Sequence, residues 1–334
     1  MKKNVTIKDI AKELGVHHTT VSLALRNSKS IREETRKKVW DKANEMGYRP
    51  NRLAQGFRNK RSNTIGLLVP NIQHHFFAKF IAEFSEKANQ EDYAVMVFQS
   101  NEKLATEKKN VEALIANRVA GALVSISKET IEANHFKAFN EEDIPLVFFD
   151  RTPTQTGLSR VVADNFHGAY QAVNQMIAKG RKRIAFITGS SHINVYHERL
   201  QGYQQALIDH GLPLDEELLI YGDFFMEDGI KGAKKLMQLS PKPDAILGVG
   251  DDVAIGVIKF LNGAGYKVPD DVAVIGFDND PMGIAIEPEL TTVDQPIKEM
   301  AESALQLLLK NINSDDKKPE EIFLTPRILK RKSC

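Results

Sequence analysis

The chain has 334 residues, of which 42% are hydrophobic and 27% are charged, a composition typical of a globular protein with more than one domain. Its single cysteine, Cys334, excludes a disulfide framework or a cysteine metal site built within one chain. The basic start Met1-Lys2-Lys3 runs into a mixed polar segment, unlike a secretory signal, and no run approaches the roughly 18 apolar residues of a membrane helix. We therefore expect a cytoplasmic protein that does not enter a membrane.

Charge is distributed unevenly along the chain. Residues 1–61 contain 16 lysines and arginines and 6 acidic residues, a net charge of +10, whereas the remaining residues contain 29 and 38, a net charge of −9. A compact basic segment beside an acidic body is typical of nucleic-acid binding, because basic side chains that neutralise phosphates gain affinity by releasing counterions. A solvated basic face is the alternative interpretation.

The first expected elements are two short helices separated by a glycine turn. Thr6 and Asp9 have the spacing of a capping box, and Gly15 suits the left-handed conformation just past a helix end. The apolar positions of the second helix leave a mainly polar outer face. The side chains expected on that face are His17, His18, Thr19, Ser22 and Leu23. This pattern predicts a helix-turn-helix unit whose second helix enters the major groove of DNA.

A third helix is expected over about 33–46, followed by a break and a short segment at about 51–58 that is basic at both ends. Alone in water this segment is too short, and too weakened by Gly56, to form a stable helix. It could fold on DNA, where an apolar side chain can enter a minor-groove base step. A plain interdomain linker is the alternative.

Beyond residue 62, short β-branched runs alternate with amphipathic stretches, which predicts strands alternating with helices in a parallel sheet. Strands are expected near 65–69, 93–98, 120–125, 144–149, 161–163, 183–188, 244–249 and 272–277. These are too many strands for one compact unit, so we expect two doubly wound lobes. A ligand would then bind at the carboxyl ends of the strands, in the crevice between the lobes.

Polar and aromatic residues follow the expected strands. Carboxylates and a guanidinium group bond hydroxyls in pairs, and aromatic rings pack on the apolar face of a sugar or base. The candidates include Asn71, Phe76, Asp150, Arg199, Asp251 and Asp278. Alternatives stay open, since an aspartate can cap the following helix and Arg199 can bridge the lobes as an ion pair. Phe76 and Phe77 are adjacent on a helix and should not both face the core, so at least one is expected at the crevice or an interface.

Four segments resemble the lac and galactose repressor family of bacterial transcription regulators. They are TIKDIAKELGV at 6–16, TTVSLAL at 19–25, TRKKVWDKANEMGYRPN at 35–51 and SNTIGLLVP at 62–70, and the likeness extends over essentially the whole chain. The resemblance implies an α/β protein with a helix-turn-helix head and hinge helix at 1–61 and a core at 62–334 similar to periplasmic sugar-binding proteins. Within the core it implies one lobe at about 62–163 and 292–323 and a second at about 164–291 and 324–334.

The resemblance also implies contacts with DNA, carried over by position. The matching residues are His18 and Thr19 for base edges, Thr6, Thr20 and Ser22 for phosphates, and Asn51, Ala54 and the intercalating Phe57 for the minor groove. Three positions depart from the family pattern. Leu23 replaces an arginine that bonds guanine and could touch a thymine methyl group instead, Arg32 replaces a small capping residue, and Phe57 replaces a leucine. We therefore expect a two-fold symmetric operator whose half-site departs from the commonest family sequence.

For the core, the resemblance implies that Asp150, Arg199 and Asp278 hold a small effector and that Phe76 and Phe224 flank it. A sugar or sugar derivative is the effector class that the family favours, and the regulator would act as a homodimer without a cofactor. Whether the effector induces or corepresses stays open, as does a protein corepressor of the kind used by carbon-catabolite relatives.

The sequence argues against two other classes of protein. A nucleotide-using enzyme would need a glycine fingerprint, but Gly248-Val249-Gly250 is followed by aspartates that would repel a pyrophosphate. The adjacent pairs at 17–18 and 74–75 lack the spacing of histidine metal ligands. A sugar-binding transport protein would share the core but would need export and no basic head. We therefore predict a regulator and not an enzyme.

Overall fold

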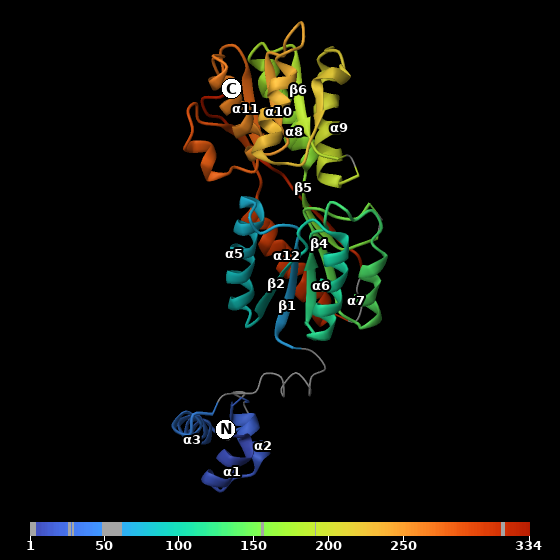
Figure 1. Cartoon of the computed structure of the whole chain (residues 1–334). Helices are drawn as coiled ribbons and strands as arrows, with labels where there is room; N and C mark the ends of the chain where they lie inside the picture. The colour runs from blue at the N-terminus through green and yellow to red at the C-terminus, as the bar shows by residue number, and fades with distance from the viewer. Residues whose placement is uncertain are drawn as a thin grey trace. The chain divides into compact units, whose positions relative to one another are not determined.

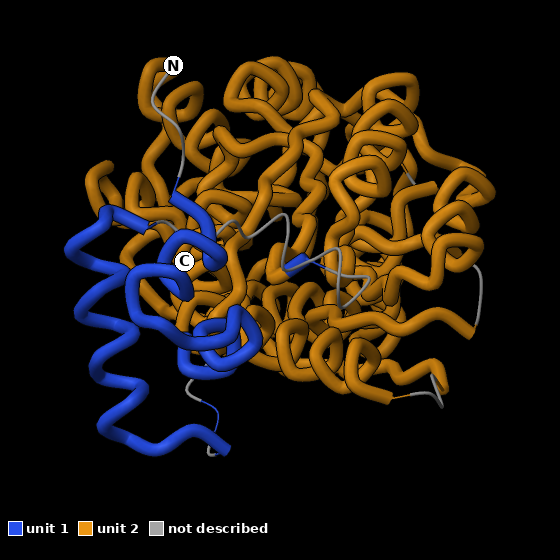
Figure 2. The backbone as a smooth tube through the Cα atoms, turned by 90° about the horizontal axis from the view of Figure 1, so that it is seen from below, with its two compact units in different colours: residues 1–62 blue, residues 63–334 orange. Residues whose placement is uncertain are grey.

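The computed structural model of the chain describes residues 5–25, 28, 30–48, 62–154, 157–190, 192–314 and 318–334. The chain divides into two compact units, residues 1–62 and residues 63–334 (Figure 2). The hinge segment expected at 51–58 lies outside the described residues. In the described part of the chain, none of the helices has the length and apolar character needed to cross a membrane.

The described part of the first unit contains α1 (Ile7–Leu14), α2 (His18–Leu25) and α3 (Glu33–Glu45). The predicted capping box is confirmed: the Asp9 carboxylate accepts the Thr6 N–H at 2.8 Å, and the Thr6 hydroxyl oxygen accepts the Asp9 N–H at 3.3 Å. Gly15 ends α1 with a φ of +62°, a conformation that costs glycine little. The three helices share a small apolar core centred on Ile10, Val21 and Val39.

The second unit contains two six-stranded sheets (Figure 1). The first has the strand order β11-β5-β4-β3-β1-β2, and the second has the order β12-β10-β9-β8-β6-β7. The first sheet is built from β1 (Thr64–Val69), β2 (Ala94–Gln99), β3 (Gly121–Val124), β4 (Leu146–Phe149), β5 (Arg160–Ala163) and β11 (Glu321–Leu324). The second is built from β6 (Ile184–Thr188), β7 (Leu219–Tyr221), β8 (Ala245–Gly248), β9 (Ala273–Phe277), β10 (Thr291–Asp294) and β12 (Arg327–Leu329). All described pairs are parallel except β10 with β12.

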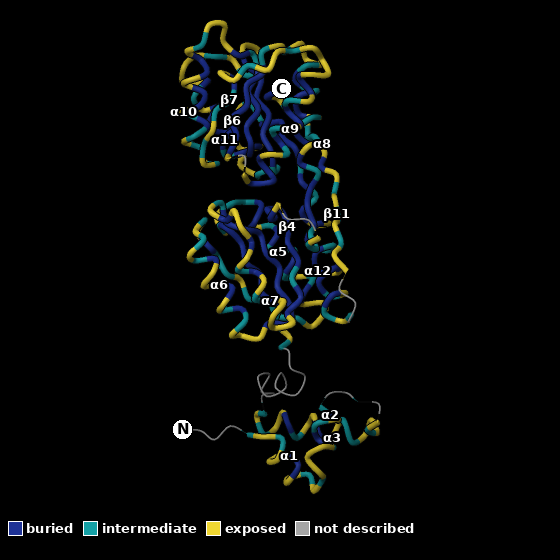
Figure 3. Tube along the Cα trace, turned by 90° about the vertical axis from the view of Figure 1, so that its right-hand side faces the viewer, coloured by how far each residue is buried: buried dark blue, intermediate teal, exposed yellow. Residues whose placement is uncertain are grey.

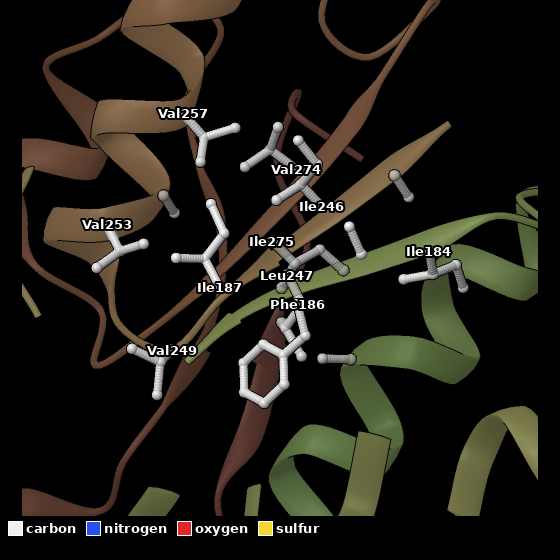
Figure 4. Packing of buried hydrophobic residues seen from close by; sticks show 14 of the residues in the cluster. Ile184, Phe186, Ile187, Ile246, Leu247, Val249, Val253, Val257, Val274 and Ile275 are labelled. Carbon is white, nitrogen blue, oxygen red and sulfur yellow. The ribbon is translucent and has the colours of Figure 1, made fainter. Parts of the chain in front are cut away.

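Helices pack around each sheet to form two lobes. The first lobe contains α5 (His75–Gln90), α6 (Leu104–Ala116), η1 (Asn134–Phe136), α7 (Lys137–Glu141) and α12 (Ile297–Asn313). The second contains α8 (Asn165–Ala178), α9 (Asn194–Asp209), η2 (Glu216–Leu218), α10 (Met226–Leu236), α11 (Asp251–Gly263) and η3 (Pro281–Ile284). The strands are mostly buried and the outer helix faces are exposed (Figure 3). Short runs of apolar residues form the central strands because parallel strands are buried on both faces, as Ile246, Leu247 and Val274 show (Figure 4).

All eight predicted strands are present, each within two residues of its expected ends. One lobe boundary was wrong. The return to the first lobe was expected at about 292, but β10 pairs with β9 in the second sheet, and the first lobe resumes only with α12 at Ile297. The strand β10 had not been predicted, because its two threonines and its aspartate leave it without the apolar run of the predicted strands. The connection between the lobes therefore passes through Gln295 and Pro296.

Candidate functional site

The outer face of α2 presents several polar side chains to solvent. Val21 and Ala24 are buried in the head, whereas His18, Thr19 and Leu23 are exposed. His17, just before the helix, is also exposed, and Thr20 and Ser22 are partly buried. The structure thus leaves the predicted base-reading side chains accessible on one short helix, a geometry that suits insertion into a major groove.

Three of the predicted contact residues, His17, Thr19 and Thr6, have hydrogen-bond partners within the head. The Nδ1 atom of His17 lies 2.9 Å from the Thr19 hydroxyl, and the rings of His17 and His18 are 4.2 Å apart. The Thr6 hydroxyl donates to the Asp9 carboxylate at 2.7 Å, so a phosphate contact by Thr6 must share that group. The predicted minor-groove residues Asn51, Ala54 and Phe57 lie outside the described residues.

A cavity of about 40 Å³ lies between the two lobes of the second unit, and the free space in and around it, open solvent included, is about 500 Å³. Six of the seven predicted effector residues line it: Phe76, Asp150, Arg199, Phe224, Asp251 and Asp278. Asn71 does not; its side-chain oxygen accepts the Gln73 N–H at 2.9 Å in the turn before α5. The other lining residues are His74, His75, Phe77, Arg151, Val195, Tyr196, Asp252, Asp280 and Gln295.

The cavity residues follow the carboxyl ends of strands in both lobes, where doubly wound folds place their ligands. Asp150 follows β4, Asp278 follows β9, and Phe224 lies in the loop after β7. All three have positive φ angles, of +55°, +103° and +77°. Such conformations cost free energy for residues other than glycine and cluster at functional sites. The surrounding fold therefore keeps these three residues in backbone conformations that they would otherwise disfavour, and this places them in the cavity lining.

Asp251 is held by the protein itself. Its Oδ1 accepts the Thr292 hydroxyl at 2.7 Å, and its Oδ2 accepts the Asp280 N–H at 2.7 Å. Burial raises the pKa of Asp251 well above its ordinary value. The side chain is 2% exposed, so its main role in this structure is to fix the loop after β9 to β10. We infer that it shapes the cavity more than it offers a free oxygen to a ligand.

Arg199 is buried within the second lobe. Its guanidinium group lies over the Phe277 ring, 3.5 Å from the centroid, and its Nε donates to the Asn165 side-chain oxygen at 3.0 Å. Nη1 donates to the Val249 carbonyl, and Nη2 lies 3.7 Å from Asp278 Oδ1. These partners all belong to the second lobe, which contradicts the alternative that Arg199 is a lobe-bridging ion pair.

The arginine that does bridge the lobes is Arg151. Its Nη1 donates to both carboxylate oxygens of Glu102, at 2.8 and 3.0 Å, within the first lobe. Its Nη2 donates to the Tyr196 hydroxyl of the second lobe at 3.1 Å. Nearby, Asn194 Nδ2 donates to the Asp150 carbonyl at 3.1 Å. A change in the angle between the lobes must therefore rearrange groups at the edge of the cavity.

Aromatic rings form the apolar part of the lining. Phe76 and Phe77 both belong to the first-lobe core and both line the cavity, because α5 begins where the core meets the cavity. The premise that only one of them could face the core was wrong, although the expected contact with the crevice is present. Phe224 stacks on Tyr196 with centroids 5.9 Å apart, and a Cβ atom at Gly250 would lie 2.2 Å from the Phe224 ring. Phe224 thus occupies the space beside the glycine.

Tyr196 and Gln295 were missed as candidates. Tyr196 lies three residues before Arg199 on α9, and this spacing places two side chains on one helix face, so the signal was present. Gln295 follows β10, a strand that had not been predicted, so its place at a strand end could not be seen. Among the described residues, no group of three or more His, Cys, Asp or Glu side chains is arranged to hold a metal ion.

A three-helix unit with an exposed polar second helix, together with a two-lobed unit around a polar cavity, defines a DNA-binding regulator with a ligand-binding core. Residues 6–51 match the family model of bacterial regulatory proteins of the lacI family, and residues 173–334 match that of the periplasmic binding protein-like domain. The probable HTH-type transcriptional repressor ExuR of Bacillus subtilis (strain 168) is 34% identical over 333 residues, covering 98% of each chain. The chain belongs to the lacI family of bacterial regulatory proteins.

Solved structures agree with this membership. The lac repressor dimer bound to operator and the anti-inducer ONPF is 25% identical with a TM-score of 0.88, covering 99% of each chain. The complex of the transcriptional regulator CelR with cellobiose is 27% identical with a TM-score of 0.76, covering 99% of this chain and 100% of that one. The chain is a transcriptional regulator with a helix-turn-helix head and a periplasmic-binding-protein-like core, and not an enzyme.

Proposed function

We propose that this regulator binds a two-fold symmetric operator as a homodimer, and that a small carbohydrate effector in the interlobe cavity controls its affinity for DNA. The observation that carries the proposal is the cavity, which is lined by polar and aromatic side chains from both lobes. A ligand that contacts both lobes favours one lobe arrangement over another by its difference in affinity for the two. The effect on DNA follows if the lobe arrangement sets the spacing of the paired heads.

The DNA-binding role belongs to residues 1–61, with 51–58 as a hinge that contacts the operator. The exposed face of α2 and the net charge of +10 over residues 1–61 support this assignment. His18 and Thr19 would read base edges, and Leu23, which is 39% exposed, would contact a thymine methyl group. The lac repressor relative, whose structure is a dimer bound to operator, supports the same mode of action.

Exposed apolar side chains on the second unit support dimerisation. Val97 lies on β2, an edge strand of the first sheet, and is 39% exposed. Met282 and Ile284, on η3 of the second lobe, are 55% and 57% exposed. Exposed apolar side chains mark a contact with another protein where they gather into a patch, as we infer for Met282 and Ile284, which lie two residues apart on η3.

The carbohydrate class is supported by the chemistry of the cavity. Carboxyl groups of Asp150 and Asp278 can accept hydroxyl protons in pairs, while the rings of Phe76, Tyr196 and Phe224 can pack on the apolar face of a sugar. CelR, a relative of the same fold, was solved with cellobiose.

The test of DNA recognition is a selection of the purified full-length chain on random duplexes, followed by affinity measurements at two salt concentrations. We expect a palindrome, with affinity that falls steeply with salt. The His18→Ala and Thr19→Ala variants should each weaken operator binding by about 1–3 kcal/mol. The Asn44→Ala variant, at an exposed position on α3, is the control and should leave it unchanged. Recovery of sequences without two-fold symmetry would overturn the proposal.

A further inference from the structure

Both arginine side chains of the cavity are already neutralised by carboxylates of the protein. Arg151 Nη1 donates to both carboxylate oxygens of Glu102, and this pair is largely buried, with side chains 6% and 18% exposed. Arg199 lies 3.7 Å from Asp278, with side chains 2% and 12% exposed. Each guanidinium group also donates to further protein groups, namely the Tyr196 hydroxyl and the Val249 carbonyl. A ligand anion would therefore have to compete with a protein carboxylate for either arginine.

Carboxyl groups outnumber the remaining cations around the cavity. Asp150, Asp252 and Asp280 also line it, and the facing histidine, His74, has its Nδ1 3.7 Å from Asp252. Among the described residues, no hydrogen bond reaches the carboxyl group of Asp150. An anion placed here would lie beside the carboxyl groups of Asp252 and Asp280 in a partly desolvated site, and beside Asp150, whose pKa burial already raises to about 7; both effects raise the free energy of a bound anion.

The unsatisfied groups of the cavity are mostly hydrogen-bond acceptors. The Gln295 side chain is 3% exposed, and its Nε2 donates to Asp278 at 2.6 Å. Its Oε1 is buried without a partner in the described part of the structure. A buried acceptor without a donor is costly, so a ligand that supplies an O–H or N–H here gains free energy. Together with the Asp150 carboxyl group, this oxygen favours a ligand that has several hydrogen-bond donors.

We propose that the cavity selects ligands that donate hydrogen bonds and carry no anionic group, so that uncharged sugars bind and the corresponding uronic acids and sugar phosphates are excluded. This inference rests on the proposed function, because it takes the cavity as the effector site. It goes further in naming the charge class of the effector. It also assigns Gln295 and the Arg151–Glu102 pair as determinants of specificity.

Calorimetry on the full-length chain tests the inference with matched ligands. Glucose, galactose and mannose are each compared with their own uronic acid and 6-phosphate, which share the ring and differ in charge. We expect at least one uncharged hexose to bind, and its two anionic forms to bind at least about 100-fold more weakly. An anionic form that binds as tightly as its parent, or tightly where the parent does not bind, overturns the inference.

A second panel separates this inference from the proposed function. If no carbohydrate in either charge class binds, the carbohydrate assignment fails, and a set of uncharged, cationic and anionic metabolites then tests the charge rule by itself. An anionic metabolite that binds and loses affinity in the Arg199→Gln variant overturns the rule. An uncharged or cationic metabolite that binds, and loses affinity in the Gln295→Leu variant, supports it.

The Glu102→Gln variant tests the mechanism of exclusion directly. It removes the charge that neutralises Arg151, while an amide oxygen in the place of Glu102 Oε2 can still accept from Arg151 Nη1 and from the Lys128 N–H. The amide nitrogen then replaces Oε1 and no longer accepts from Arg151. We expect the discrimination between the hexose and its uronic acid to fall about tenfold. Glu129→Gln is the matched control, because Glu129 pairs with Lys103 outside the cavity lining. Unchanged discrimination in a folded Glu102→Gln variant contradicts the assigned role of the pair.

Discussion

The Asp150 carboxyl group sits at the end of β4 with a left-handed backbone, and burial raises its pKa to about 7. The neighbouring arginines, Arg151 and Arg199, lower the pKa but do not cancel the effect of burial. Because the folded-state pKa lies above the ordinary value of 3.8, the protonated form is the one that stabilises the fold. That stabilisation is fully present below about pH 4 and is lost as the pH rises through about 7.

The Asp150→Asn variant should therefore be more stable than the natural chain above pH 7, with the difference shrinking as the pH falls toward 5. The shift in pKa sets an upper limit of about 4 kcal/mol, and water in the open cavity should reduce the observed gain to about 1–2 kcal/mol. Urea unfolding followed by circular dichroism between pH 5 and 8.5 measures the difference. Parallel stability curves for the two proteins would show that the carboxyl group is not perturbed.

Gly250 offers a second test at a single residue. A Cβ atom there would lie 2.2 Å from the Phe224 ring, so the Gly250→Ala variant must displace that ring from its place beside Tyr196. We expect affinity for the effector to fall at least about tenfold, measured by calorimetry. Gly263→Ala is the control: Gly250 precedes α11 as its N-cap and Gly263 ends the helix, where the added methyl group meets nothing within 4 Å. The control should keep its affinity, and equal losses in both variants would refute a specific role for the Phe224 position.

Among the elements, α3 of the head begins without a side-chain cap. Arg32 has the extended backbone of an N-cap residue, with φ of −58° and ψ of 143°, but makes no capping hydrogen bond. The Arg32→Ser variant places a hydroxyl oxygen where it can accept the N–H of Glu34 or Thr35. We expect it to stabilise the head by about 1 kcal/mol over the Arg32→Ala variant, which removes the arginine without adding a cap.

Trp40 allows the stability of the first unit to be measured separately from that of the second. It is the single tryptophan of the chain and lies on α3, so its fluorescence reports unfolding of the first unit independently of the second. Urea titrations of the two Arg32 variants, followed at the emission of Trp40, give the difference directly. Coincident midpoints would mean that the start of α3 is already satisfied in another way.

The elements also show how far the sequence predicts this structure. The helices of the head and eight of the twelve described strands were predicted because apolar runs, helical periodicity and glycine stops are strong local signals. The strands β7, β10, β11 and β12 were missed. The first, third and fourth of these are edge strands without a fully buried residue, and β10 contains two threonines and an aspartate, so none has the buried apolar run of the predicted strands. Gln295 was missed with β10, and the partners of Asp251 and Arg199 could not be predicted because they come from elements distant in sequence.

At the scale of the whole molecule, the proposed homodimer leads to the most specific prediction. An isologous dimer places the same surface on both subunits, so one substitution changes the interface twice. Ile284 is 57% exposed on η3, and nothing in the fold of the single chain requires an apolar side chain there. An aspartate at this position would bury two carboxylates in the dimer, one from each subunit, whereas in the monomer the carboxylate would remain hydrated.

The Ile284→Asp variant should therefore shift the chain toward the monomer at micromolar concentration, measured by sedimentation equilibrium. Because two linked heads gain affinity from binding two half-sites together, the monomer should bind a palindromic operator at least about 100-fold more weakly. Ile131→Asp is the control, since Ile131 is even more exposed, at 74%, and lies in the loop before η1. Loss of the dimer in the control but not in Ile284→Asp would move the interface to the loop before η1. If both variants stay dimeric but only Ile284→Asp loses the operator, η3 acts in coupling the subunits and not in joining them.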